Sequence, residues 1–362
     1  MSIHQMLFSV NATGPAGPTD LAITTNTLGA ETVRLQWTGA YVYPKVYVNG
    51  SLYYQFTTNN FVNGFCIISG LTPATSYTFG VTFSSTYGGA EGSMSTVSAT
   101  TLTSYVSSVS APSGYTYTFG KYKAIFVPYS SNVTITYSSG SLPLYYNLVG
   151  GSYDGTAGGA DGYGGVGGNS GKIYEKSLTL SSLTSGTAYA AVIGSSAGGN
   201  TTFNGYSSAS GIEYGGGAGG YPNSTGGTGG SLTPSFWPSE WQNYFLTYVF
   251  GPGGGGGGGM EGGDGEGKAG GQGTYLVVQQ TSNSGTSTAY YGSSGGKGGN
   301  SYGGDGTDGD SGQGCYILGS NQGGSGGGGG GGAGLGYNSS GMGGNGGSGG
   351  AGILVVLFQY CS

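Results

Sequence analysis

Apolar and polar residues alternate in short segments along the first hundred residues, a pattern that indicates half-buried β-strands. Thr32–Trp37 alternates in this way, and so does Lys45–Val48. Asn49-Gly50 then predicts a tight hairpin, because both central residues of such a turn adopt positive φ. Further strands are expected at Ser51–Tyr54, Phe65–Ile68, Ser76–Ser84 and Ser95–Leu102. Regular short strands separated by turn residues predict an all-β sandwich over residues 13–103, preceded by an amino-terminal arm over residues 1–12.

The strand pattern resumes after residues 104–113, which contain Ser and Pro and are expected to form a linker. Strands are predicted at Tyr115–Phe119, Lys123–Val127, Asn132–Tyr137 and Leu144–Val149. The chain also ends in a continuous apolar run, Gly352–Tyr360, which is typical of a fully buried strand. Residues 114–362 are therefore expected to form one glycine-rich domain that contains β-strands.

Glycine is distributed unevenly, with 15 residues in 1–150 and 72 of the 87 glycines in 151–362. Gly-Gly-X triplets recur at 164–169, 295–300 and 343–351. A polyproline-II-type helix has three residues per turn and no internal hydrogen bonds, so its backbone groups need partners outside it. Glycine on two sides of each turn lets neighbouring backbones meet. The triplets therefore predict a packed set of polyglycine-II helices, with a flexible Gly/Ser linker as the alternative.

One stretch of the first domain carries a family resemblance. Leu71 and Tyr77 in Gly70–Phe79 match the tyrosine corner of fibronectin type III domains, and Trp37 matches the buried tryptophan of their second strand. The Asn49-Gly50 hairpin fits the same family. The resemblance spans about 85 residues and implies a β-sandwich that serves as a spacer or a binding module, since fold alone does not define function.

The span 114–362 resembles the glycine-rich domains near the ends of phage tail-fibre and other viral surface proteins. In that family a strand ends in a glycine run, a strand pair and an Asn-Thr-x-Phe segment follow, and glycine triplets lead into a terminal apolar strand. Here these features are Leu148–Gly151, Ser177–Leu180 with Ala188–Gly194, Asn200–Phe203, and Gly349–Tyr360. The span is also similar to the tip adhesins of T-even-like phage long tail fibres, whose polyglycine-II helices hold variable loops that grip the host.

The candidate recognition residues interrupt the glycine runs. Phe236–Phe245 has no glycine and includes two of the three tryptophans. Aromatic residues with polar neighbours are typical of binding hot spots, so Phe236, Trp237, Trp241 and Tyr244 are candidate receptor contacts. The alternative is that this segment caps an open end of the glycine lattice. Further candidates are Tyr290, Tyr291, Tyr302 and Tyr337, in loops whose Tyr, Ser, Gly and Asn residues are typical of adaptable binding loops, with surface decoration as the alternative.

Charge is sparse and argues against several partners. Charged residues make up 6% of the chain, against about 25% in ordinary soluble domains. The net charge is −6, which disfavours nucleic acid and anionic membrane surfaces. The chain contains no run of 18 apolar residues, so we expect no membrane insertion. The 31 tyrosines argue against disorder.

The sequence contains few residues of the types that catalysis commonly uses. The single histidine is His4, and no nucleophile–base pair or His/Cys metal set is apparent. Asp305, Asp308 and Asp310 cluster, but their spacing matches neither an EF-hand loop nor the nonapeptide calcium-binding repeats. We therefore expect no enzymatic activity, no catalytic or metal-binding residues and no cofactor. Cys66 is expected to be a buried apolar residue, and spacing leaves open whether Cys315 pairs with Cys361.

These observations favour a non-enzymatic virion surface protein, located on the virion or extracellularly. It would be a tail fibre, a tip adhesin or a minor capsid decoration that presents loops for host attachment. Expected partners are a host surface glycan or protein and other virion subunits, with a homo-oligomer compatible with the sequence. The alternative is a self-assembling structural subunit of an extracellular filament or capsid. An ice-binding protein with a flat polyglycine-II face is a third and weaker hypothesis.

Overall fold

The computed structural model describes residues 14–24, 27–38, 43–57, 63–112, 116–151, 153–154, 156, 169, 171–195, 198–212 and 351–362, and the backbone of six further short strands between residues 276 and 323. The described residues form antiparallel sheets with two 3₁₀ turns, η1 (Leu180–Ser182) and η2 (Ser208–Ser210). The predicted all-β class is confirmed. No helix in this part of the chain is long and apolar enough to cross a membrane. The arm at 1–12 and the triplets at 164–168, 295–300 and 343–350 lie outside the described residues.

The first domain is a sandwich of two antiparallel sheets. One sheet has the order β1 (Ala22–Ile23), β2 (Thr32–Thr38), β5 (Asn63–Ser69). The other has the order β4 (Ser51–Gln55), β3 (Lys45–Val48), β6 (Ser76–Thr82), β7 (Ser95–Thr100). Their inner faces share one core, which includes Val33, Leu35, Trp37, Val46, Cys66, Ile68, Phe79 and Val81. The predicted burial of Trp37 and Cys66 is confirmed.

The Asn49-Gly50 hairpin forms as predicted. Asn49 has a φ of 49° and Gly50 a φ of 79°, and the turn joins β3 to β4. The Asn49 side-chain oxygen also accepts a hydrogen bond from the Thr78 backbone N–H at 2.9 Å, which fastens the turn to β6. The turn residues thus set the register of the hairpin and of its neighbour.

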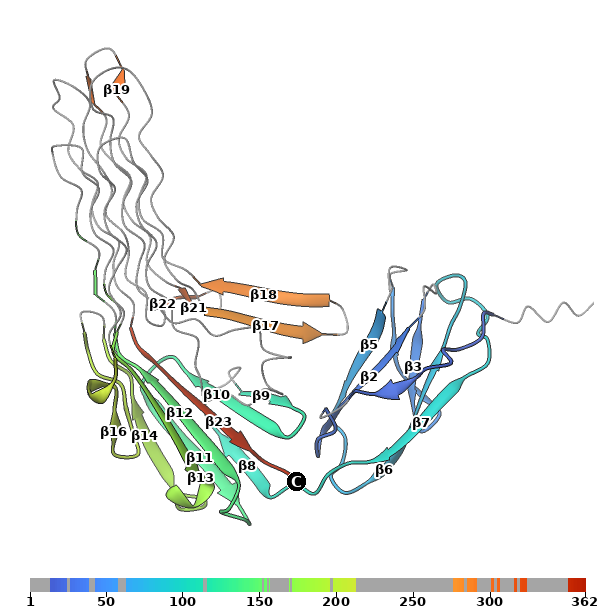
Figure 1. The fold of residues 1–362 in the computed structure, drawn as a ribbon, viewed down its shortest axis with the longest axis horizontal. Helices are drawn as coiled ribbons and strands as arrows, with labels where there is room; N and C mark the ends of the chain where they lie inside the picture. The colour runs from blue at the N-terminus through green and yellow to red at the C-terminus, as the bar shows by residue number, and fades with distance from the viewer. Residues whose placement is uncertain are drawn as a thin grey trace, which may run out of the picture.

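The second domain is also a sandwich, of two five-stranded sheets (Figure 1). The first sheet has the order β13 (Ile173–Thr179), β12 (Pro143–Val149), β23 (Ile353–Gln359), β10 (Tyr122–Val127), β9 (Thr116–Phe119). The second has the order β16 (Tyr206–Ser207), β15 (Thr202–Phe203), β14 (Ala188–Val192), β11 (Ser131–Tyr137), β8 (Val106–Ser110). The four strands predicted between 115 and 149 are confirmed as β9 to β12.

Two expectations for this domain are wrong. The expected linker 104–113 contains β8, which pairs with β11 and so belongs to the sandwich. The expected strand pair does not form either, because β13 pairs with β12 whereas β14 pairs with β11. The chain crosses from one sheet to the other through η1, whose Leu180 is buried in the shared core.

The terminal strand β23 completes the first sheet of the second domain from far along the chain. It lies between β12 and β10 and is paired with both over six residues each. It follows an insert, residues 213–350, that separates it from β16 and η2. Figure 1 shows β23 in red among strands coloured green. The predicted buried strand at the carboxyl end is confirmed, since Ile353–Phe358 are all 1% exposed or less.

The two sandwiches share a local motif that links a loop to a strand. Leu71–Tyr77 and Leu183–Tyr189 both have the pattern Leu-Thr-x-x-Thr-x-Tyr. In each, the tyrosine hydroxyl accepts a hydrogen bond from the backbone N–H of the threonine five residues earlier, at 2.9 Å for Tyr77 and 2.7 Å for Tyr189. Both contacts lower the pKa of the tyrosine, chiefly through the threonine hydrogen bond. The second domain therefore repeats a stabilising feature of the first.

We expect Tyr189→Phe to lower the stability of the second sandwich modestly. The phenyl ring keeps its packing against Phe203, but the Thr184 N–H loses its acceptor and must turn to water. Thermal unfolding of the full chain measures the effect. Tyr174→Phe is a suitable control, because it also removes a tyrosine hydroxyl while the ring keeps its stacking on Tyr206. Equal melting temperatures for the Tyr189 variant and the parent protein would contradict a stabilising role for the hydroxyl.

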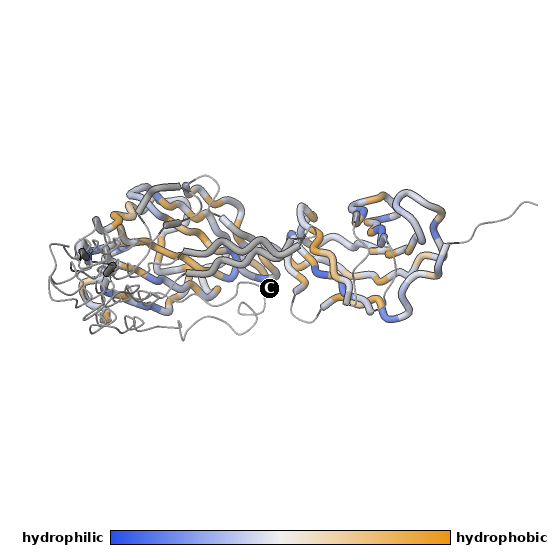
Figure 2. Tube along the Cα trace, turned by 90° about the horizontal axis from the view of Figure 1, so that it is seen from above, coloured by the Kyte–Doolittle hydropathy of each residue, from blue (hydrophilic) through white to orange (hydrophobic). Residues whose placement is uncertain are grey.

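The two sandwiches lie end to end and meet beside the carboxyl terminus (Figures 1 and 2). Ala30 of the first domain is fully buried in the core of the second. The Glu31 backbone N–H donates to the Tyr360 hydroxyl at 3.2 Å, and Lys123 forms an ion pair with the Glu31 carboxylate at 3.0 Å. The Lys123 ammonium also lies 4.6 Å from the centre of the Tyr360 ring. Cys361 is buried and its thiol is free, whereas Cys315 lies outside the described residues.

Candidate functional site

Most of the predicted receptor contacts fall outside the described residues. These five of the eight candidates are Phe236, Trp237, Trp241, Tyr244 and Tyr337.

The other three candidates lie on strands of known backbone. Tyr290 and Tyr291 belong to β18 (Gly285–Tyr291), opposite Val277 and Leu276 of β17 (Leu276–Ser282). Tyr302 belongs to β19 (Ser301–Tyr302), which pairs with β20 (Asp305–Gly306). A third pair joins β21 (Tyr316–Ile317) to β22 (Ser320–Gly323). The insert thus contains hairpins, and three of the eight candidates are placed in two of them.

Two excursions of the chain, residues 150–172 and residues 213–352, begin and end at the same end of the second sandwich. Ile353, Val149 and Ile173 are in register across β23, β12 and β13, and Ile173 forms a bridge with Ile212. The segment after Val149 and both ends of the segment between Ile212 and Ile353 therefore lie at this end of the sheet. Three strand spacings of about 4.8 Å place the two ends of the insert about 14 Å apart. The sandwich accordingly holds the insert by both ends.

Glycines line this end wherever the excursions cross. We call them the glycine collar: Gly150, Gly171, Gly194, Gly199, Gly211 and Gly352. A Cβ atom on Gly150, Gly171, Gly211 or Gly352 would lie within 3.0 Å of a backbone atom of a different segment, and one on Gly194 or Gly199 would lie that close to the backbone of their own loop. Gly352, for instance, donates its N–H to the Gly194 carbonyl at 2.8 Å, and a side chain there would overlap the Val149 carbonyl oxygen. Backbones meet directly in the collar because no side chain separates them.

Thr201 is the polar centre of the collar. It is 0% exposed, and its hydroxyl donates to the Val149 carbonyl at 2.6 Å while accepting from the Gly194 N–H at 3.0 Å. Its own backbone N–H donates to the hydroxyl of buried Ser208 at 3.0 Å, and the Ser208 N–H donates back to the Thr201 carbonyl at 2.9 Å. Five buried backbone groups are satisfied in this way, which joins both sheets at the base of the insert.

A polar pair lies three to four residues along the strands from the collar. Asn147 and Glu175 are directly opposite each other on β12 and β13. Asn147 is 1% exposed, and neither its amide nitrogen nor its amide oxygen has a hydrogen-bond partner. One carboxylate oxygen of Glu175 is likewise buried and unpartnered. Burial raises the pKa of Glu175 from 4.5 to about 7.

This shift predicts a pH-dependent stability. A carboxyl whose pKa is higher in the folded than in the unfolded state binds more protons when folded, so its contribution to stability falls as pH rises from about 4.5 to about 7. We expect Glu175→Gln to be more stable than the parent protein at pH 8, with a difference that shrinks toward pH 5. Urea unfolding at a series of pH values measures this. A constant difference across that range would contradict it.

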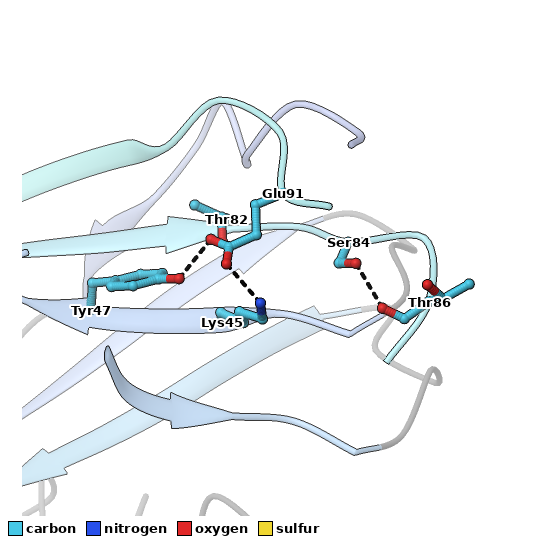
Figure 3. A network of polar contacts seen from close by, with 6 residues as sticks. All are labelled: Lys45, Tyr47, Thr82, Ser84, Thr86 and Glu91. Atoms are coloured by element: carbon cyan, nitrogen blue, oxygen red, sulfur yellow. Dashed lines mark hydrogen bonds and ion pairs between the residues drawn. The ribbon is translucent and has the colours of Figure 1, made fainter. Parts of the chain in front are cut away.

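A second polar cluster fixes the loop between β6 and β7 of the first sandwich (Figure 3). The Glu91 carboxylate accepts hydrogen bonds from Lys45 at 2.6 Å, Tyr47 at 2.6 Å and Thr82 at 2.8 Å. Burial opposes ionisation of Glu91, but these three donors outweigh it and hold its pKa below the ordinary value. Burial and the adjacent carboxylate raise the pKa of Tyr47 to about 12. The cluster is internally satisfied, so its role is to hold the loop on the sheet.

The sequence analysis identified the segments that meet in the collar but not the buried hydrogen bonds that join them. The motif residues 148–151, 200–203 and 349–360 were expected to follow in order along the chain, and the structure brings them together at one end of the sandwich. Thr201 and Ser208 carried no distinguishing signal, because the chain contains many Thr and Ser residues. Neither protein-family models nor curated protein sequences match this chain.

Proposed function

We propose that the chain is a virion surface protein of the tail-fibre or adhesin type, in which a double sandwich presents the 213–350 insert to a host receptor. The observation that carries this proposal is the collar. It anchors both ends of a long glycine-rich insert on one rigid end of the second sandwich. Binding residues are commonly held on loops that a rigid scaffold positions. The expected receptor is a glycan or protein of the host surface.

The finer fold assignment is part of the proposal. A sheet of three strands facing a sheet of four, a buried Trp37 and the Tyr77 hydroxyl bonded to the Thr72 N–H support a fibronectin type III module as a spacer. The side-chain-free contacts of the collar support polyglycine-II packing in the insert, because both depend on backbones that meet without side chains. The proposed protein is non-enzymatic and acts by adhesion.

Cell binding by the full chain tests the adhesin proposal. We expect Tyr290→Ala/Tyr291→Ala and Trp241→Ala/Tyr244→Ala to weaken binding to host cells at least tenfold, since aromatic contacts commonly dominate binding energy. The matched control is Tyr53→Ala/Tyr87→Ala on the first sandwich, whose rings are 38% and 59% exposed. We expect no change in the control.

Two outcomes would overturn the adhesin proposal. One is the absence of cell binding by a folded parent protein that polymerises alone, as seen by light scattering and negative-stain imaging, which is the behaviour of a filament subunit. The other is equal binding by the insert variants and the first-sandwich control, which would place recognition away from these loops.

A further inference from the structure

One edge strand of the first sandwich, β7, has open backbone groups. Thr101, directly after β7, donates its N–H to the Thr75 carbonyl, and hydrogen bonds to a neighbouring strand involve every second residue of an antiparallel pair. The residues between them, Thr96, Ser98 and Thr100, therefore direct their N–H and C=O groups away from β6. No group of the described residues bonds to these outward backbone groups. The edge of β7 is thus open from Thr96 to Thr100.

The other edge strands of the two sandwiches carry features that hinder pairing with a further strand. β1 and β16 have two residues each and β9 has four, and the β3–β4 and β8–β11 pairs contain register shifts. The Tyr53 hydroxyl accepts a hydrogen bond from the Ser69 N–H of β5 at 3.0 Å, and Ile212 pairs with Ile173 of β13. By contrast, β7 has no charged residue, no proline and no register shift. Of these edges, it is the one suited to pairing with another strand.

The outer face beside this edge is a ladder of hydroxyl groups. The side chains of Thr96, Ser98 and Thr100 are exposed. The Thr100 hydroxyl lies 2.8 Å from the Ser76 hydroxyl, and the Ser98 hydroxyl lies 3.0 Å from that of Thr78. Pairs of hydroxyl residues on neighbouring strands stabilise a sheet, and neither β6 nor β7 carries a charge that would repel an identical strand.

We propose that β7 pairs with β7 of a second copy of this chain, antiparallel and about a two-fold axis at Ser98. Such an axis keeps every side chain on its own face of the sheet and makes the two edges identical. Ser98 then lies opposite the partner's Ser98, and Thr96 lies opposite the partner's Thr100, so each outward N–H meets a C=O. Two four-stranded sheets become one continuous sheet, and the row of Thr78 and Ser98 hydroxyls continues across the axis.

This contact is closed and small. A two-fold contact between identical surfaces stops at two chains, so it gives a dimer and not the filament of the alternative function. An edge of five residues is about 17 Å long, which is short for a standard interface of about 800 Å² per partner, so the dimer is weak. The pairing does not depend on adhesion. A dimer would present two inserts together and so gain avidity, and that consequence alone rests on the function proposed above.

Sedimentation of the full chain from about 1 μM to about 1 mM tests the pairing, since weak interfaces associate in that range. We expect the mass to rise from one chain toward two. Ser98→Lys places two ammonium groups opposite each other at the axis and is expected to weaken dimerisation about tenfold or more.

Thr78→Lys is the matched control for Ser98→Lys. Thr78 is also exposed, lies directly opposite Ser98 on β6 and shares its hydroxyl contact, so both variants break the same hydroxyl pair and add the same charge. Its distance from the partner's Thr78 would be three strand spacings, about 14 Å, which exceeds the screening length of about 8 Å at physiological ionic strength. We expect Thr78→Lys to dimerise like the parent protein.

A charge swap and an amide measurement make the test independent of any single variant. Ser98→Glu alone is expected to be monomeric, like Ser98→Lys, whereas an equimolar mixture of the two variants regains the dimer. In the parent protein, hydrogen exchange at the amides of Thr96, Ser98 and Thr100 is expected to slow as concentration rises. The amides of Val97 and Ala99, which face β6, should not change.

Three results would each contradict the pairing. The first is a parent protein that stays monomeric up to about 1 mM with exchange that is independent of concentration. The second is an equal loss of dimer in Ser98→Lys and Thr78→Lys, which would place the contact away from the β7 edge. The third is a mixture of the lysine and glutamate variants that remains monomeric. None of these measurements involves host cells, so they fail or succeed separately from the adhesion assay.

Discussion

Replacing Gly352 by alanine is expected to lower the free energy of unfolding by about 3 kcal/mol, the upper part of the usual range for overpacked sites. A Cβ atom there would overlap the Val149 carbonyl oxygen and the Thr201 hydroxyl. Neither can move aside cheaply, since Val149 is held in the middle of three paired strands and Thr201 is fully buried. The Gly352 N–H would also shift away from the Gly194 carbonyl.

Urea unfolding followed by circular dichroism measures this change. Gly80→Ala is the matched control, because a Cβ atom there would also meet a neighbour, namely the Met94 side chain. Met94 is flexible and 42% exposed, so it can rotate away and the loss should be small. Similar losses at Gly352 and Gly80 would mean that the close backbone approach in the collar is not rigid.

Thr201→Val is expected to destabilise the protein by about 2–4 kcal/mol. Valine has nearly the same shape as threonine but no hydroxyl. The Val149 carbonyl and the Gly194 N–H would both lose their buried partner, and each such loss costs about 1–3 kcal/mol. Because the effect arises from hydrogen bonding and not from volume, Thr201→Ser separates the two causes.

The serine variant keeps the hydroxyl and removes one methyl group, which is worth about 1 kcal/mol. We therefore expect Thr201→Ser to lie between the parent protein and Thr201→Val in urea unfolding. Hydrogen exchange at the Gly194 amide gives a local readout, with faster exchange in the valine variant only. A serine variant as unstable as the valine variant would assign the effect to packing instead.

These two changes act at the base of the insert and so bear on its proposed role. A binding element held at both ends by a rigid scaffold loses less conformational entropy when it binds. Loosening the collar should therefore weaken adhesion even though Gly352 and Thr201 contact no receptor. That dependence links the stability of the second sandwich to the function we propose.

The sequence by itself predicted most strands of both sandwiches, although not β1, β8 or β16. Alternation of apolar and polar residues, as in Thr32–Trp37, reports which side of a strand is buried, and that signal is local. The Asn49-Gly50 turn was equally readable, because its two positive φ angles restrict the residues that fit. The continuous apolar run that became β23 likewise signalled a strand buried on both faces.

Only the tertiary structure decided which strands became neighbours. Nothing local tells β23 to lie between β12 and β10, or β13 and β14 to join different sheets, because pairing depends on contacts between residues far apart in the chain. The same holds for Thr201, an ordinary threonine in sequence that becomes a hub once three segments meet around it. The hydrophobic pattern is a property of the sequence, whereas the hydrogen-bond partners of a residue are decided only when the chain folds.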